Sequence, residues 1–105
     1  MSEFWAEVRI HLLPSESGGR TLPLDLCNDR PGDYRPHFRV INGSGEMLGV
    51  AFMDGPDDPL QPGESTYATV KGMYPTVSYD ELVTGSRFEI LEGAQVVGHG
   101  EVVGR

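Results

Sequence analysis

Apolar and polar residues alternate with a period of two along much of this chain, as in strands with one buried and one solvated face. The clearest run is 6–12. Its apolar positions are Ala6, Val8, Ile10 and Leu12, and its polar positions are Glu7, Arg9 and His11. Further apolar or alternating runs span 21–27, 36–42, 47–53, 65–73, 86–92 and 95–103. No window keeps an apolar i, i+3, i+4, i+7 pattern, so the sequence predicts an all-β barrel or sandwich without long helices.

Turn-forming residues separate these runs. Residues 17–19 and 42–45 supply glycine and asparagine, which accept positive φ, and residues 92–95 have the pattern of a hairpin with a two-residue turn. The segment 54–63 contains three prolines, which lack amide donors and fix φ, so it is predicted to be a loop.

Length and charge limit the possible functions. At 105 residues the chain has the usual size of one domain, and we expect residues 1–105 to share a single core. Its 16 acidic and 8 basic residues give a formal net charge of −8, which repels nucleic acid and anionic lipid at long range. RNA binding would therefore require a local basic patch.

Cysteine usage and hydropathy indicate the compartment. The single cysteine, Cys27, excludes a disulfide within this chain and the paired-cysteine patterns of zinc and redox sites. Residues 1–20 lack a basic segment followed by a long apolar stretch, and no window has the roughly 18 apolar residues of a membrane span. We therefore expect a cytoplasmic protein that does not enter a membrane.

Four parts of the sequence carry motifs in a familiar order and spacing. They are residues 4–8 (F-W-A-E-V) with 16–23 (E-S-G-G-R-T-L-P), 34–38 (Y-R-P-H-F), 60–64 (L-Q-P-G-E), and 85–93 (G-S-R-F-E-I-L-E-G) with 97–100 (V-G-H-G). Together they resemble the C-terminal domain of bacterial elongation factor Tu, whose motifs include F-x-A-E-V, E-E-G-G-R-x-T-P, Y-R-P-Q-F, M-x-P-G-D and G-x-R-F-A-I-R-E-G. The resemblance covers nearly the whole chain and implies a six-stranded antiparallel β-barrel.

The family domain works beside a GTPase whose phosphate loop reads G-x-x-x-x-G-K-[ST]. The single lysine of this chain, Lys71, follows no such run. We therefore expect a stand-alone barrel that neither binds GTP nor carries a cofactor.

The resemblance also implies a surface for RNA. In the family, this domain contacts the T-stem backbone of aminoacyl-tRNA through the glutamine of Y-R-P-Q-F and the R-E-G turn. The matching positions implicate His37, Glu92 and Gly93 in RNA binding. Leu91 replaces the arginine of that turn and the following G-R is not kept, so two cationic partners for phosphate are absent.

Arg20, Arg35 and Arg39 are candidates for contacts with a partner. One interpretation is a small cationic patch for phosphate or an acidic loop; the other is that they clamp turns by donating to carbonyls and to carboxylates such as Asp33 or Glu16. The sequence leaves both open.

Aromatic residues beside arginines are typical of binding hot spots. Trp5 is out of phase with the alternating apolar residues that follow it, so it is expected to point outward and contact a partner. The alternative is an irregular first strand in which Trp5 caps an open end of the barrel. Tyr34, Tyr74 and Tyr79 are further candidates for an interaction surface.

No catalytic or metal-binding pattern is recognisable. The histidines at positions 11, 37 and 99 lack H-x-x-x-H spacing, and the aspartates at 54, 57 and 58 do not match a calcium loop. No G-x-S-x-G elbow is present, so neither a metal nor a catalytic residue is predicted.

We expect a non-catalytic binding module with a protein partner, such as a GTPase or another component of the translation apparatus. Binding of tRNA or structured RNA is the alternative, and an enzyme of unknown type the third.

Overall fold

Six strands and one short helix make up the regular structure of the described residues. The computed structural model describes residues 4–26 and 31–105. Its strands are β1 (Trp5–Leu12), β2 (His37–Val40), β3 (Leu48–Asp54), β4 (Ser65–Gly72), β5 (Arg87–Glu92) and β6 (Gln95–Gly104), and a short 3₁₀ helix, η1 (Ser15–Ser17), follows β1.

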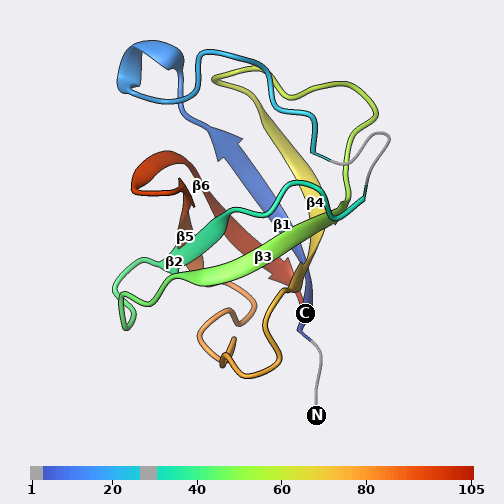
Figure 1. Ribbon diagram of the computed structural model, residues 1–105, viewed down its shortest axis with the longest axis vertical. Helices are drawn as coiled ribbons and strands as arrows, with labels where there is room; N and C mark the ends of the chain where they lie inside the picture. The colour runs from blue at the N-terminus through green and yellow to red at the C-terminus, as the bar shows by residue number, and fades with distance from the viewer. Residues whose placement is uncertain (1–3, 27–30) are drawn as a thin grey trace.

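The strands wrap around a common interior (Figure 1). They close into a barrel in the order β1-β4-β3-β2-β5-β6, and every neighbouring pair is antiparallel. Closure brings the first and last strands together, because β1 pairs with β6 on one side and with β4 on the other. The prediction of a six-stranded antiparallel β-barrel is confirmed.

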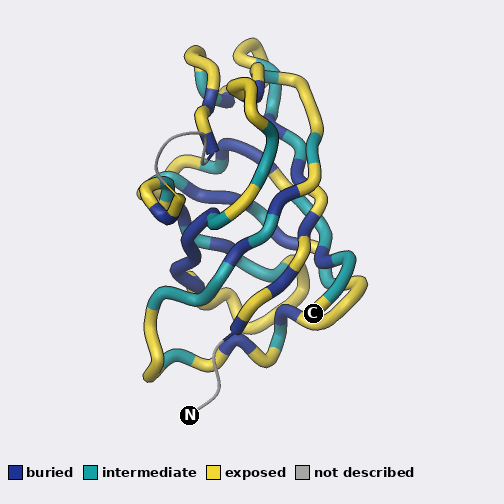
Figure 2. The backbone as a smooth tube through the Cα atoms, turned by 90° about the vertical axis from the view of Figure 1, so that its right-hand side faces the viewer, coloured by how far each residue is buried: buried dark blue, intermediate teal, exposed yellow. Residues whose placement is uncertain are grey.

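The apolar positions of the alternating pattern fill the barrel. Buried and exposed residues alternate along β1, and the burial pattern continues around the wall (Figure 2). Phe38 stacks on Phe88 with ring centroids 3.9 Å apart, and it meets Phe52 edge-on at 6.0 Å. An interior packed with its own side chains is what a barrel of this size holds.

Six of the seven predicted runs are strands, and 21–27 is the exception. The residues described there form one isolated bridge, in which Leu24 and Leu60 exchange two hydrogen bonds of 2.8 Å. Leu24 and Leu26 are buried in the core, but Pro23 has no amide hydrogen to donate. The segment therefore packs as a loop across one end of the barrel (Figure 1). Cys27 lies outside the described residues.

The predicted turns are confirmed. Gly18, Asn42, Gly45 and Gly93 all have φ between 61° and 86°, and the β5–β6 hairpin turns at residues 93–94. The proline-rich segment predicted as a loop over 54–63 is a loop from residue 55 onward, since Asp54 ends β3, and the bridge at its buried leucine anchors it.

The loop between β4 and β5 closes the other end of the barrel (Figure 1). Tyr79, only 6% exposed, stacks on Phe4 with ring centroids 5.1 Å apart. Its hydroxyl donates to the Gly49 carbonyl over 2.6 Å and accepts from the amides of Met73 and Tyr74 at 3.0 and 3.2 Å. Tyr79 therefore belongs to the core and does not form part of an exposed aromatic surface.

Candidate functional site

The first candidate region is the corner where the β5–β6 turn meets the start of β2 and the loop after η1. We call Arg20, Tyr34, His37, Glu92 and Gly93 the Glu92 corner. The Tyr34 hydroxyl donates to Glu92 Oε2 over 2.7 Å, and Nη1 of Arg20 donates to the same oxygen. The Glu92 carboxylate thus ties two loops to the end of β5.

The Glu92 corner contains an ion pair between Arg20 and Glu92 and a protonated Tyr34 hydroxyl. The side chains of Arg20 and Glu92 are 24% and 29% exposed, so solvent screens their ion pair only in part. Burial, followed by the adjacent Glu92 carboxylate, raises the pKa of the Tyr34 hydroxyl well above its ordinary range. Tyr34 therefore stays protonated and remains a donor.

The residues that the sequence implicated in RNA binding lie close together here. The β2–β5 register sets His37 opposite Leu91, which precedes Glu92 and Gly93 in the chain. Beside them is an open hollow of about 300 Å³, lined by Gly19, Arg20, Thr21, Leu22, Glu92 and Gln95. The hollow contains one guanidinium and one carboxylate, and these are already paired with each other.

The other two arginines singled out in the sequence are also bonded within the protein. Nε of Arg35 donates to the Gly32 carbonyl over 2.7 Å. Nε and Nη2 of Arg39 donate to Glu89 Oε1 at 3.0 and 2.8 Å, joining β2 to β5. Each of the three arginines thus has its own acceptor, two of them carboxylates on β5.

A second region runs along the outer wall of β1 and β4. We call Trp5, Tyr67, Thr69 and Lys71 the aromatic stripe. Trp5 is 43% exposed and lies opposite Lys71, whose Nζ is 5.9 Å from the centre of the indole ring. Tyr67 is 60% exposed and lies opposite Arg9. Trp5 therefore points outward, in phase with the other exposed positions of β1.

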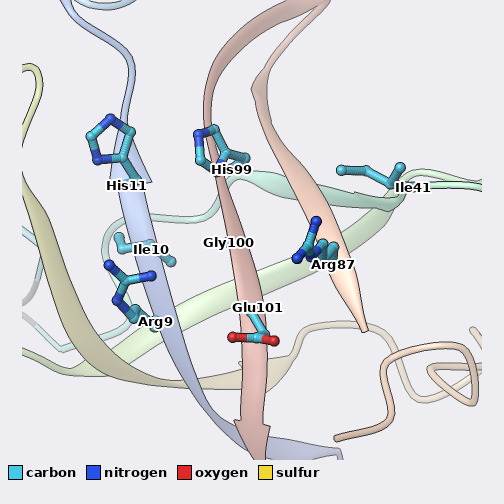
Figure 3. A pocket seen from close by; sticks show the side chains of 8 residues that line it. All are labelled: Arg9, Ile10, His11, Ile41, Arg87, His99, Gly100 and Glu101. Carbon is cyan, nitrogen blue, oxygen red and sulfur yellow. The ribbon is translucent and has the colours of Figure 1, made fainter. Parts of the chain in front are cut away.

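A third region, which the sequence patterns alone did not reveal, is a groove across β1, β6 and β5 (Figure 3). We call it the cationic groove. It has a volume of about 300 Å³ and is lined by Arg9, Ile10, His11, Ile41, Arg87, His99, Gly100 and Glu101. In Figure 3, Arg9 and His11 project from β1, His99 and Glu101 from β6, and Arg87 from β5.

The two histidines of the cationic groove face each other across the seam that closes the barrel. His11 and His99 are direct partners in the β1–β6 ladder, with ring centroids 5.1 Å apart. Nδ1 of His11 is hydrogen-bonded to Ser65 Oγ at 2.8 Å. Partial burial, followed by the nearby charges of His11, Arg9 and Arg87, lowers the pKa of His99 below its usual value of 6.5. The neutral form of His99 is therefore favoured at pH 7.

The sequence placed the residues of the cationic groove on strands but did not show that these strands are neighbours. Alternation puts Arg9 and His11 on the solvated face of the first strand, and the last predicted strand contains His99 and Glu101. Only the closure of the barrel shows that these two strands are neighbours.

In residues 4–26 and 31–105, no group of three or more His, Cys, Asp or Glu side chains could hold a metal ion. None of the helical segments described there is long and apolar enough to cross a bilayer. No family model matches the chain.

Proposed function

We propose that this chain is a non-catalytic binding module whose aromatic stripe contacts a protein partner. The observation that carries the proposal is the pair of exposed rings, Trp5 and Tyr67, on the paired strands β1 and β4 of the barrel wall. Tryptophan, tyrosine and arginine are the residues most enriched at the energetic centres of protein interfaces. Aromatic side chains have only two χ angles, so they also lose little conformational entropy on binding.

The charges beside the rings define the chemistry of the partner. Lys71 lies opposite Trp5 and Arg9 lies opposite Tyr67, so each ring has a cation at its cross-strand position. A partner segment that combines apolar and acidic side chains complements this arrangement. Such a segment would place its apolar groups on the rings and its carboxylates near Lys71 and Arg9.

We further propose that the barrel is of the elongation factor Tu C-terminal type and acts in the cytoplasm. The ordered motifs support this kinship, and a closed six-stranded antiparallel barrel is compatible with it. By that kinship the partner is a component of the translation apparatus, and a GTPase is one candidate. The barrel itself binds no nucleotide in this proposal.

Affinity capture from a lysate of the source organism tests the proposal, with bound protein and bound RNA identified in the same eluate. We expect a discrete protein partner without RNA, and we expect its recovery to fall at least about tenfold with Trp5→Ser, because hot-spot truncations cost roughly 2 kcal/mol or more. Val83→Ser is the matched control, since Val83 is also an exposed apolar residue but lies outside the stripe. Equal recovery with both variants would contradict the assignment of the stripe.

The alternative is binding of tRNA or structured RNA through the Glu92 corner. The observation in its favour is that His37 lies opposite Leu91, beside Glu92 and Gly93. A T-stem RNA hairpin titrated at low and moderate salt separates the two proposals, because phosphate contacts weaken steeply with salt. Saturable RNA binding that persists at moderate salt and is lost in His37→Ala would replace the protein-partner proposal.

A further inference from the structure

The cationic groove gathers positive charge on a protein whose formal net charge is −8. Arg9 and Arg87 stand on either side of β6, and His11 and His99 lie at one end of the groove (Figure 3). Its one carboxylate is Glu101. Barrel closure thus brings basic residues of three strands to a single concave surface.

The two guanidinium groups of the groove are available to a ligand. Among the described residues, the side chains of Arg9 and Arg87 form no ion pair or hydrogen bond with the protein, whereas Arg20, Arg35 and Arg39 are each bonded internally. Arg9 and Arg87 are both ladder partners of Glu101, yet neither is joined to its carboxylate. The groove therefore holds two exposed cations that have no acceptor among the described residues.

The donors of the groove suit a compact anion with several oxygens. A guanidinium presents a planar fork of N–H donors that matches phosphate and carboxylate geometry, and imidazole N–H groups add single donors. The volume of about 300 Å³ exceeds that of a tetrahedral oxyanion with part of its hydration shell.

We propose that the cationic groove binds a doubly charged oxyanion, a phosphate or sulfate group, between Arg9 and Arg87, with His11 and His99 as further donors. The site lies on β1, β6 and β5; it shares Arg9 with the proposed partner contact, but its other residues lie outside the aromatic stripe. The group is either a free inorganic ion or the phosphoryl group of a larger molecule.

Binding should strengthen as the pH falls. The charged groups that face the histidine pair are Arg9 on β1, Glu101 on β6, and Arg87 and Glu89 on β5, while β4 contributes the Ser65 hydroxyl. Glu89 accepts two hydrogen bonds from Arg39, which offsets its charge. A bound dianion would relieve the repulsion that disfavours protonated His99, so anion binding and proton uptake promote each other.

The test is an NMR titration of the His11 and His99 ring signals with sodium sulfate, at constant ionic strength maintained with chloride. Sulfate keeps its double charge across the pH range, so only the protein titrates. We expect saturable shifts near about pH 6 and affinity at least about fivefold weaker near about pH 8. Arg9→Gln and Arg87→Gln should each weaken binding roughly tenfold, and Glu101→Gln should tighten it several-fold.

Lys71→Gln is the matched control, because it removes the same charge from the outer wall but lies outside the groove. Absence of saturable shifts, an equal loss in Lys71→Gln, or no gain in Glu101→Gln would each overturn the proposal. Parallel titrations with inorganic phosphate and N-acetyl-phosphoserine amide identify the source. Tighter binding of the amino-acid ester supports a phosphorylated macromolecule, and equal or weaker binding supports the free ion.

Discussion

At the scale of single residues, the Tyr79 hydroxyl holds together the end of the barrel. It satisfies one carbonyl and two amides from different segments, and the ring carrying it is almost fully buried. We expect Tyr79→Phe to lower the free energy of unfolding by about 1–2 kcal/mol, because the Tyr74 amide loses its acceptor and the Gly49 carbonyl keeps only the bond from the Met73 amide. Urea denaturation measures the change.

Tyr67→Phe is the control for this prediction. Tyr67 is exposed and, among the described residues, its hydroxyl forms no hydrogen bond within the protein. Its loss should therefore alter stability by no more than roughly 0.5 kcal/mol. Equal effects of the two substitutions would show that the hydrogen bonds of Tyr79 contribute nothing.

Arg20 allows the two interpretations of the sequence to be separated. Its guanidinium is bonded to Glu92, which also accepts from Tyr34. We expect Arg20→Ala to lower the free energy of unfolding by roughly 1–2 kcal/mol, because a partly buried carboxylate loses its charged donor. Arg9→Ala, which removes a guanidinium without an internal partner, should change it by at most about 0.5 kcal/mol. An unchanged urea midpoint for Arg20→Ala would favour a ligand-binding role.

At the scale of elements, the seam between β1 and β6 depends on glycine. A Cβ placed on Gly100 would lie 2.6 Å from the Arg9 carbonyl oxygen and 2.7 Å from the Phe88 ring. We expect Gly100→Ala to destabilise the protein by roughly 1–3 kcal/mol, since backbone and a core ring must move apart. Gly104→Ala is the control because nothing lies within 4 Å of its added Cβ. Thermal unfolding of both variants checks the difference, and comparable melting temperatures would contradict it.

The strands show which parts of the fold could be predicted from the sequence. Alternation and turn chemistry located all six strands, because both are local properties of the chain. The run 21–27 was wrong for a tertiary reason: Leu24 and Leu26 alternate with exposed residues, but they cap the barrel end instead of extending the sheet. A period-two pattern of apolar residues thus identifies an extended segment, but it does not show whether that segment pairs with neighbouring strands.

At the scale of the whole molecule, closure of the barrel determines what the sequence could not show. His11 and His99 are far apart in the chain, and their pairing depends on β1 meeting β6. The internal partners of Arg20 and Arg39 likewise arise because β5 lies beside β2 and the preceding loops. The motifs grouped His37, Glu92 and Gly93 in advance, whereas the bonds of Arg20 and Tyr34 to Glu92 and the cationic groove required the three-dimensional structure.

The charge distribution of the closed barrel leads to a pH dependence of its stability. The folded protein holds the pKa of His99 below its usual value of 6.5, first through partial burial and then through the charges of His11, Arg9 and Arg87. In the window between the unfolded and folded pKa values, the unfolded chain therefore binds more protons at His99 than the folded one does. By linkage, the free energy of unfolding should fall as the pH decreases through 6.5 toward the folded pKa, and the contribution is fully present only above 6.5.

Urea denaturation at several pH values between about 7.5 and 5.5 measures this slope, a range in which most carboxylates stay ionised. His99→Gln should reduce the slope, because it removes the group that titrates differently in the two states. Arg87→Gln should reduce it less, since one of several causes of the shift is removed while the histidine remains. A His99→Gln variant that keeps the full slope would place the proton uptake elsewhere. A flattened slope would assign the loss of stability in acid to protonation of His99 at the β1–β6 seam, the condition under which a bound anion would stabilise the fold most.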